Sequence, residues 1–182
     1  MLIMQMITTG LAEEPGWRDF ALPRLQAKFG PMKSAFIVGP LWALWHMPLF
    51  LTEWGGYPDA HWSRPISFAV FCIGFNFVMA WVFNRTNQSL PLAMLAHVGV
   101  NNFMSVAWDE MFPTVSAVTA EIALGVSATI AAAVIIVLTR GRLGYTEQLK
   151  SEQLHSDRLD SGEIDESVLV RPDNRLKAGA NT

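Results

Sequence analysis

Residues 34–51 read SAFIVGPLWALWHMPLFL and contain no charged side chain. The hydrocarbon core of a bilayer is about 30 Å thick, and about 20 apolar residues of α-helix are needed to cross it. A charge-free stretch of this length therefore predicts a transmembrane helix. Residues 65–84 and 86–108 also lack charges, and residues 116–139 carry only Glu121. We therefore expect an all-α, polytopic transmembrane helix bundle.

The composition of the whole chain agrees with a membrane protein. Apolar residues make up 51% of the 182 residues and charged residues only 16%, against about 25% charged residues in soluble domains. The formal net charge is -3, and the sequence has no basic stripe of the kind that binds nucleic acid. The lipid bilayer is therefore an expected partner, and nucleic acid is not.

Apolar length predicts four full spans and one partial span. The full spans are expected at about 33–51, 65–83, 88–107 and 115–138. The partial one, residues 1–12, would rise only about 18 Å as a helix, so we expect further sequence to precede it in the intact protein. Pro15 then disfavours a helical conformation at Glu14 and predicts a kink or an end of the helix there.

The distribution of Lys and Arg predicts the orientation. Residues 13–33 carry four basic side chains, residues 52–64 carry one and residues 109–114 carry none. Cytoplasmic connections are enriched in Lys and Arg, so residues 13–33, the turn around Arg85 and the C-terminal tail are predicted to be cytoplasmic. We divide the chain into a membrane-embedded domain, 1–142, and a polar tail, 143–182, expected to lack regular structure.

Polar side chains in or beside the apolar segments are the candidates for chemistry. Such groups are energetically unfavourable in a membrane, so they indicate a functional site by default. The set consists of Glu13, Glu14, Arg18, His46, His97 and Asn101. A lone histidine in a span could equally hydrogen-bond a neighbouring helix, but two histidines, an amide and a carboxylate pair on three segments favour a shared site.

Local sequence predicts how some of these side chains are presented. His97 and Asn101 are four residues apart, so they share one face of a helix. Small residues at Ala93, Ala96 and Gly99 would let another helix approach closely. Most tryptophans fall near predicted span ends, which is typical of aromatic belts. Asn76 and Asn102 are expected to pair between helices, and Glu121 is expected to extend towards the membrane surface or to pair between helices.

These residue types allow two kinds of hydrolytic chemistry. A carboxylate with an imidazole can activate water as a general base, and a second imidazole with an amide can stabilise an oxyanion. A glutamate with two histidines, here Glu13, His46 and His97, is also a ligand set for Zn²⁺. The sequence leaves both open, although it lacks the His-Glu-x-x-His pattern of many zinc proteases.

Three short motifs carry a resemblance to a known family. Residues 13–18, EEPGWR, resemble the Glu-Glu-x-x-x-Arg motif of the CAAX protease and bacteriocin-processing (CPBP, or Abi) family. Residues 42–46, WALWH, are similar to its aromatic-x-x-x-His motif, and residues 97–101, HVGVN, match its His-x-x-x-Asn motif. The three occur in the order of the family and cover about residues 2–107.

The resemblance implies an intramembrane endopeptidase similar to type II CAAX prenyl proteases. Glu13 and His46 would activate water, His97 and Asn101 would stabilise the oxyanion, and Glu14 and Arg18 would position and charge-balance the site. The substrate would be a membrane-associated peptide or protein. Family members are integral membrane proteins, which implies a bacterial inner membrane here, and they are called metalloproteases although a metal-free glutamate mechanism uses the same residues.

Two other functions remain open at the sequence level. One is a catalytically inactive membrane protein that acts in bacteriocin self-immunity or as a scaffold. The other is ion-coupled transport, since intramembrane carboxylates also serve that purpose. The presence of all six motif residues favours the enzyme over the inactive protein. Four full spans without a visible internal repeat argue against a transporter, and oligomeric state has no signal in the sequence.

Overall fold

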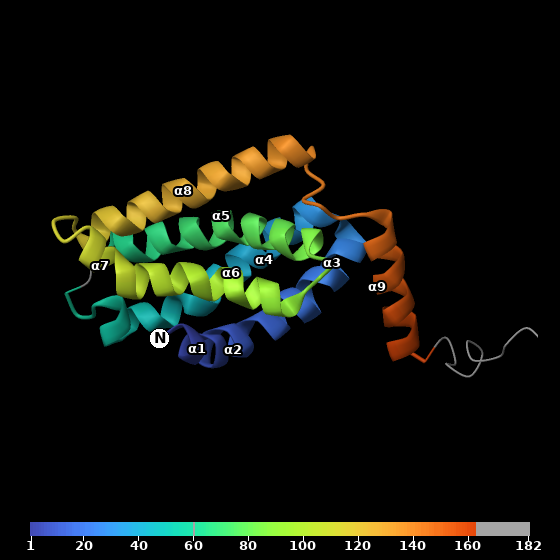
Figure 1. The fold of residues 1–182 in the computed structure, drawn as a ribbon, viewed down its shortest axis with the longest axis horizontal. Helices are drawn as coiled ribbons and strands as arrows, with labels where there is room; N and C mark the ends of the chain where they lie inside the picture. Colours follow the sequence, from blue (N-terminus) through green and yellow to red (C-terminus); the bar gives the residue numbers. More distant parts are fainter. Residues whose placement is uncertain (60, 163–182) are drawn as a thin grey trace, which may run out of the picture.

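The fold is an all-helical bundle. A computed structural model describes residues 1–59 and 61–162, and these residues contain helices and no β-strand (Figure 1). Four segments are long and apolar enough to cross a membrane: Pro31–Leu51, Ser63–Arg85, Leu90–Ala107 and Ala117–Thr139. The predicted transmembrane bundle is therefore confirmed, with span ends close to those expected from apolar length.

The chain before the first full span follows a continuous helical path. It comprises α1 (Leu2–Gln5), a π-helix η1 (Met6–Gly10), α2 (Leu11–Glu14), a π-helix η2 (Pro15–Ala21) and α3 (Leu22–Phe29). The expectation that Glu14 avoids a helical conformation was wrong, since it has helical angles of φ -65° and ψ -34°. The predicted end of the α-helix is present, because α2 ends at Glu14 and the path continues from Pro15 as a π-helix. The path ends at Gly30, whose φ is +80°.

Three long helices form the core of the bundle. α5 (Ser63–Arg85) packs extensively against both α4 (Pro31–His46) and α8 (Ala117–Thr139). Glycines allow the close crossings: a Cβ at Gly39 would lie 3.1 Å from the Ile73 Cα, and one at Gly74 would lie 2.9 Å from the Ala128 carbonyl carbon. Across the α5–α8 contact, Arg64 donates hydrogen bonds of 2.9 and 2.6 Å to Glu121, which confirms that Glu121 pairs between helices.

α6 (Leu90–Asn102) packs against the N-terminal helical path and extends through a π-helix, η5 (Phe103–Ala107), into α7 (Trp108–Met111). Ala93 is fully buried and Ala96 packs against the core, as the small-residue pattern predicts. Gly99 does not take part, because a Cβ added there would meet no atom within 4 Å. After α4, the chain turns through two 3₁₀ segments, η3 (Met47–Leu51) and η4 (Glu53–Gly55), and Pro48 lies in the first.

A helix lies where the polar tail was expected to lack regular structure. α9 (Glu147–Asp160) starts at Thr146, whose hydroxyl accepts a hydrogen bond from the Leu149 backbone N–H. Leu149 is buried, and Arg24 of α3 forms ion pairs with Asp157 at 3.6 Å and Asp160 at 3.2 Å. A helix cap, one buried side chain and contacts to α3 thus correct the prediction for this segment. The rest of the predicted tail, 163–182, lies outside the described residues.

The connections predicted to be cytoplasmic meet at one end of the bundle. A Cβ at Gly141 would lie 3.2 Å from Met32 Cγ, and one at Gly144 would lie 2.7 Å from Arg85 Cγ. Figure 1 shows α3, the end of α8 and α9 at this same end. The orientation relative to the cytoplasm stays a prediction. The structure does bring together the segments that the prediction assigns to the cytoplasmic side.

Candidate active site

The six candidate residues come together in the interior of the bundle. The exposed fraction is 9% for Glu13, 8% for His46 and 3% for His97. Glu14 and Arg18 are fully buried, and Asn101 is partly buried. They come from the N-terminal helical path, α4 and α6, which are the three segments that carry the sequence motifs.

The two adjacent glutamates point to different helices. Consecutive side chains on an α-helix differ by about 100° in direction, and Glu13 and Glu14 both lie in α2. Glu13 faces α4, where its Oε2 accepts a 2.8 Å hydrogen bond from the indole Nε1 of Trp42. Glu14 faces α6, where its Oε1 lies 2.8 Å from His97 Nδ1. The pair therefore divides between two halves of the site.

The first half consists of Glu13, Trp42 and His46. His46 Nδ1 lies 2.9 Å from the Trp42 carbonyl oxygen, which can only accept, so Nδ1 carries the proton. In the neutral ring, Nε2 then has a free lone pair. Nε2 lies 4.0 Å from Glu13 Oε2, which is too long for a direct hydrogen bond. Two acceptors therefore face each other across a gap.

The second half is a chain of charged and polar groups. Arg18 Nε lies 3.4 Å from Glu14 Oε2, and Glu14 Oε1 accepts a hydrogen bond from His97 Nδ1. Asn101 Nδ2 lies 3.4 Å from His97 Nε2. His97 is therefore held at both ring nitrogens. Because the Glu14 carboxylate can only accept, Nδ1 carries a proton, and Nε2 can accept from the Asn101 amide in the neutral ring.

Trp42 connects the two halves, and the sequence prediction of an aromatic belt did not anticipate this. Its side chain is 2% exposed. Its ring meets the His97 ring edge-on at a centroid distance of 5.2 Å, and Arg18 Cζ lies 5.0 Å from its centroid. Trp42 therefore belongs to the site, which agrees with its place as the aromatic residue of the motif at residues 42–46.

A wall of phenylalanines from α5 encloses the histidines, and sequence reasoning missed these residues as well. Phe68 lies 5.0 Å from the His46 ring, and Phe75 lies 6.5 Å from the His97 ring, centroid to centroid. Phe75 is stacked on Phe71 at 5.1 Å. An apolar enclosure of this kind strengthens the electrostatic interactions of the buried charges.

Arg18 carries most of the unsatisfied hydrogen-bonding capacity in the site. Burial lowers the pKa of its guanidinium, while the neighbouring Glu14 and Glu13 carboxylates act in the opposite direction. Arg18 lies outside the four candidate spans. None of its three side-chain nitrogens has a hydrogen-bond partner among the described residues. Buried donors of this kind require water or another acceptor, which marks the site as one that accommodates polar groups.

The three residues predicted as zinc ligands are not arranged as a ligand set. The described part of the chain contains no group of three or more His, Cys, Asp or Glu side chains that could hold a metal ion. The reason is the orientation of His97, whose ring nitrogens face Glu14 and Asn101 rather than Glu13 and His46. Glu13, His46 and His97 therefore do not converge on one point in this structure.

Comparison with known proteins identifies the family. Residues 1–103 match the family described as type II CAAX prenyl endopeptidase Rce1-like. This chain belongs to the Rce1-like family. A curated relative, CAAX prenyl protease 2 of Methanococcus maripaludis, is 24% identical over 104 residues, or 55% of this chain. The chain spans 38% of the length of that relative. No solved structure matches the chain. All six candidate residues lie within the part that matches the family.

Proposed function

We propose that the chain is an intramembrane endopeptidase that hydrolyses a peptide bond of a membrane-associated peptide or protein, in the manner of CAAX processing. The observation that carries the proposal is the pairing of Glu13 Oε2 with the free Nε2 of His46 across 4.0 Å. This pairing lies in an enclosed site of a chain from the Rce1-like family. It provides two proton acceptors at one position, as activation of water requires.

In this proposal, a water molecule held by Glu13 and His46 attacks the scissile carbonyl carbon. The water proton passes to Glu13, and the C–O bond forms as the carbonyl oxygen becomes an oxyanion. Trp42 keeps Glu13 in place through its 2.8 Å hydrogen bond. Collapse of the tetrahedral intermediate breaks the C–N bond, and the proton from Glu13 goes to the leaving amine. A base within hydrogen-bond reach contributes about 10²–10⁴-fold to such a step.

His97 and Asn101 would stabilise the oxyanion. Asn101 offers its side-chain N–H₂ as a donor, and His97 Nε2, 3.4 Å away, positions that amide. Glu14 orients the His97 ring through its 2.8 Å contact with Nδ1, and Arg18 balances the charge of Glu14. Preorganised donors at a developing oxyanion are among the largest contributions to catalysis of this kind.

Cleavage assays in liposomes test the proposal. The substrates are a farnesylated CAAX peptide and an unprenylated membrane-anchored peptide, and the variants are Glu13→Gln and His46→Ala. We expect each variant to lower kcat by at least about 100-fold. Glu53→Gln and His61→Gln provide matched controls, because these side chains lie in the 52–62 connection. Equal cleavage by the wild type and both site variants would refute the catalytic assignment. Absence of cleavage by the wild type would favour an inactive immunity or scaffold protein.

Metal analysis tests the zinc alternative separately. We expect purified, active protein to retain its activity after treatment with 1,10-phenanthroline, because His97 is oriented away from Glu13 and His46. One zinc per chain, together with loss of activity on chelation and recovery on zinc addition, would show instead that the three residues rearrange into a ligand set.

A further inference from the structure

A groove lies between α4 and α8 on one face of α5. Both helices pack against α5, and two adjacent cavities occupy the space between them. The inner cavity, about 390 Å³, is lined mainly by apolar side chains, among them Phe36, Phe77 and Ile136. The outer cavity, about 730 Å³, is lined by Trp81, Arg85, Arg142 and other residues at the end of the bundle. Together they define what we call the α4–α8 groove.

The α5 residues that line the two cavities follow one another along the helix. Ile73 and Phe77 line the inner cavity, and Trp81 and Arg85 line the outer one. Each lies one turn after the previous one, so neighbouring members of the series lie on the same side of the helix. The contribution of α5 to the lining therefore changes from apolar side chains to tryptophan and then to arginine.

The outer cavity lies at a membrane boundary. Three of the four candidate spans have an end at Pro31, Arg85 or Thr139, and all three residues line this cavity. The inner cavity is lined by residues inside the same spans. The groove thus runs from the depth of lipid head groups into the depth of acyl chains, with Trp81 at the level where aromatic residues favour the interface.

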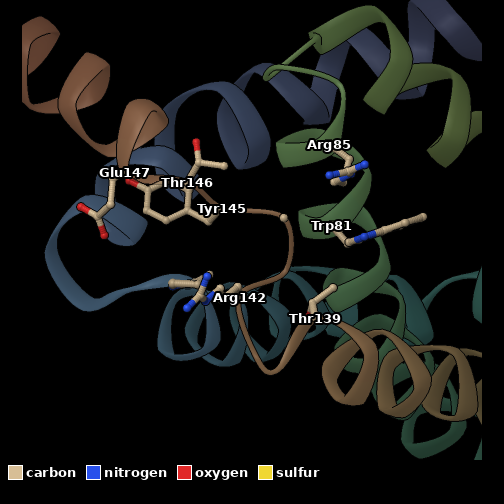
Figure 2. A pocket seen from close by; sticks show the side chains of 9 residues that line it. Trp81, Arg85, Thr139, Arg142, Tyr145, Thr146 and Glu147 are labelled. Carbon is tan, nitrogen blue, oxygen red and sulfur yellow. The ribbon is translucent and has the colours of Figure 1, made fainter.

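The outer cavity carries an excess of positive charge, with two arginines and one glutamate in its lining. In the described part of the chain, neither Arg85 nor Arg142 forms an ion pair or a side-chain hydrogen bond, and both are exposed. The carboxylate in the lining, Glu147, is 95% exposed and lies 3.9 Å from Lys150. Figure 2 shows Arg85 and Trp81 on α5, and Arg142, Tyr145 and Glu147 on the segment after α8. Two arginines from different elements therefore flank one cavity.

The arginine at the end of α5 lies against the segment after α8. Gly144 has a φ of +71°, and a Cβ there would lie 2.7 Å from Arg85 Cγ. The next residue back, Leu143, is fully buried, and its carbonyl accepts a 2.9 Å hydrogen bond from Asn84 Nδ2. The stem of Arg85 thus packs against a fixed segment of backbone, while the residue as a whole stays exposed.

We propose that the α4–α8 groove binds one anionic glycerophospholipid, with the phosphate at Arg85 and Arg142 and an acyl chain along the inner cavity. Basic pockets between transmembrane helices at the membrane boundary bind anionic lipid head groups, and arginine is well suited to phosphate. The site is separate from the candidate active site and does not depend on the proposed protease activity.

Native mass spectrometry of the detergent-purified chain tests this proposal with dioleoylphosphatidylglycerol, dioleoylphosphatidylcholine and inorganic phosphate as probes. We expect one phosphatidylglycerol per chain, bound more tightly than phosphatidylcholine. The double variant Arg85→Gln, Arg142→Gln should weaken phosphatidylglycerol binding about 25-fold, from about fivefold per arginine, and abolish the preference for it. Arg140→Gln removes the same single charge as either single variant, at the same end and without altering the lining, so it should preserve the preference. Arg85→Lys, Arg142→Lys should restore most of the binding.

A second pair of variants tests the acyl part of the groove. Ala133 lines the inner cavity, and Ala133→Phe should weaken phosphatidylglycerol by at least about fivefold, whereas Val134→Phe on the outer surface of the same helix should not. Binding of inorganic phosphate that equals or exceeds binding of the lipid would show a soluble-phosphate site and overturn the proposal. Displacement of the lipid by a farnesylated peptide would overturn the proposal in favour of a substrate site. A loss of phosphatidylglycerol binding in Arg140→Gln equal to that in the arginine variants of the lining would also overturn it.

Discussion

At the residue scale, Trp42 holds the side chain that we propose as the catalytic base. Its Nε1 donates a 2.8 Å hydrogen bond to Glu13 Oε2, and its ring contacts His97 and Arg18. The indole therefore provides both a donor and a packed surface, whereas a phenylalanine would provide only the surface. Replacing Trp42 by phenylalanine therefore removes the hydrogen bond and keeps the packed surface.

We expect Trp42→Phe to preserve the fold and lower kcat. A hydrogen bond to a charged group contributes about 1.5–3 kcal/mol, so its loss should reduce kcat by about tenfold or more while KM changes little, since Trp42 holds the base rather than the substrate. Steady-state cleavage in liposomes measures both constants. Trp62→Phe, at an indole that is 72% exposed, serves as the control. A rise in KM with unchanged kcat would mean that Trp42 contacts substrate instead.

The buried pair of Glu14 and Arg18 gives a stability prediction. Both side chains are fully buried and lie 3.4 Å apart, so removing one partner leaves an uncompensated buried charge. We expect Arg18→Met to lower the free energy of unfolding by about 3–5 kcal/mol, and the double variant Glu14→Gln, Arg18→Met to recover part of this loss. Unfolding in detergent, followed by tryptophan fluorescence, measures the change.

The control for this pair is Arg24, whose ion pairs with Asp157 and Asp160 are partly exposed. Exposed pairs contribute about 0–1 kcal/mol, so Arg24→Gln should have a small effect. If Arg18→Met were no more damaging than Arg24→Gln, the buried pair would not be a stabilising feature of the fold.

At the element scale, the crossing of α5 and α8 depends on Gly74. A Cβ at this position would lie 2.9 Å from both the Ala128 carbonyl carbon and the Thr129 nitrogen, and these backbone atoms cannot move without shifting α8. We expect Gly74→Ala to destabilise the bundle by about 1–3 kcal/mol, measured as a lower midpoint of thermal unfolding. Gly99→Ala meets no atom within 4 Å and should be neutral or stabilising, since alanine favours helix over glycine. Equal effects would mean that the crossing tolerates a wider separation.

At the scale of the whole molecule, the predicted orientation places the connection before α5 and the helix α9 on opposite sides of the membrane. Asp59 lies in the connection before α5, and Ser156 lies on α9, and both side chains are exposed. Because Cys72 is fully buried, single cysteines introduced at these positions can be labelled selectively. We expect a membrane-impermeant maleimide to label Asp59→Cys in intact cells and Ser156→Cys only after permeabilisation. Labelling of Ser156→Cys in intact cells would reverse the orientation.

The transmembrane helices and the members of the candidate site were predictable from the sequence, but their mutual geometry was not. A charge-free stretch such as residues 34–51 indicates a transmembrane helix, because burying a charge in lipid is unfavourable for each segment whatever its neighbours are. Trp42 was identified only as the aromatic residue of a motif, and Phe75 was missed, because an apolar residue in an apolar helix has no local feature that reveals its contacts. α9 was missed because its contacts with α3 are distant in sequence.

The sequence by itself determined that this chain has helices able to cross the membrane, and it predicted a shared site of Glu13, Glu14, Arg18, His46, His97 and Asn101. Only the tertiary structure decided that Glu13 pairs with α4 and Glu14 with α6, because this depends on which helix lies beside each face of α2. It also brought Arg85 and Arg142 to one cavity at the end of the bundle. The reason is physical: hydrophobicity and residue type act locally, whereas the direction of a side chain and its partners depend on how the helices pack.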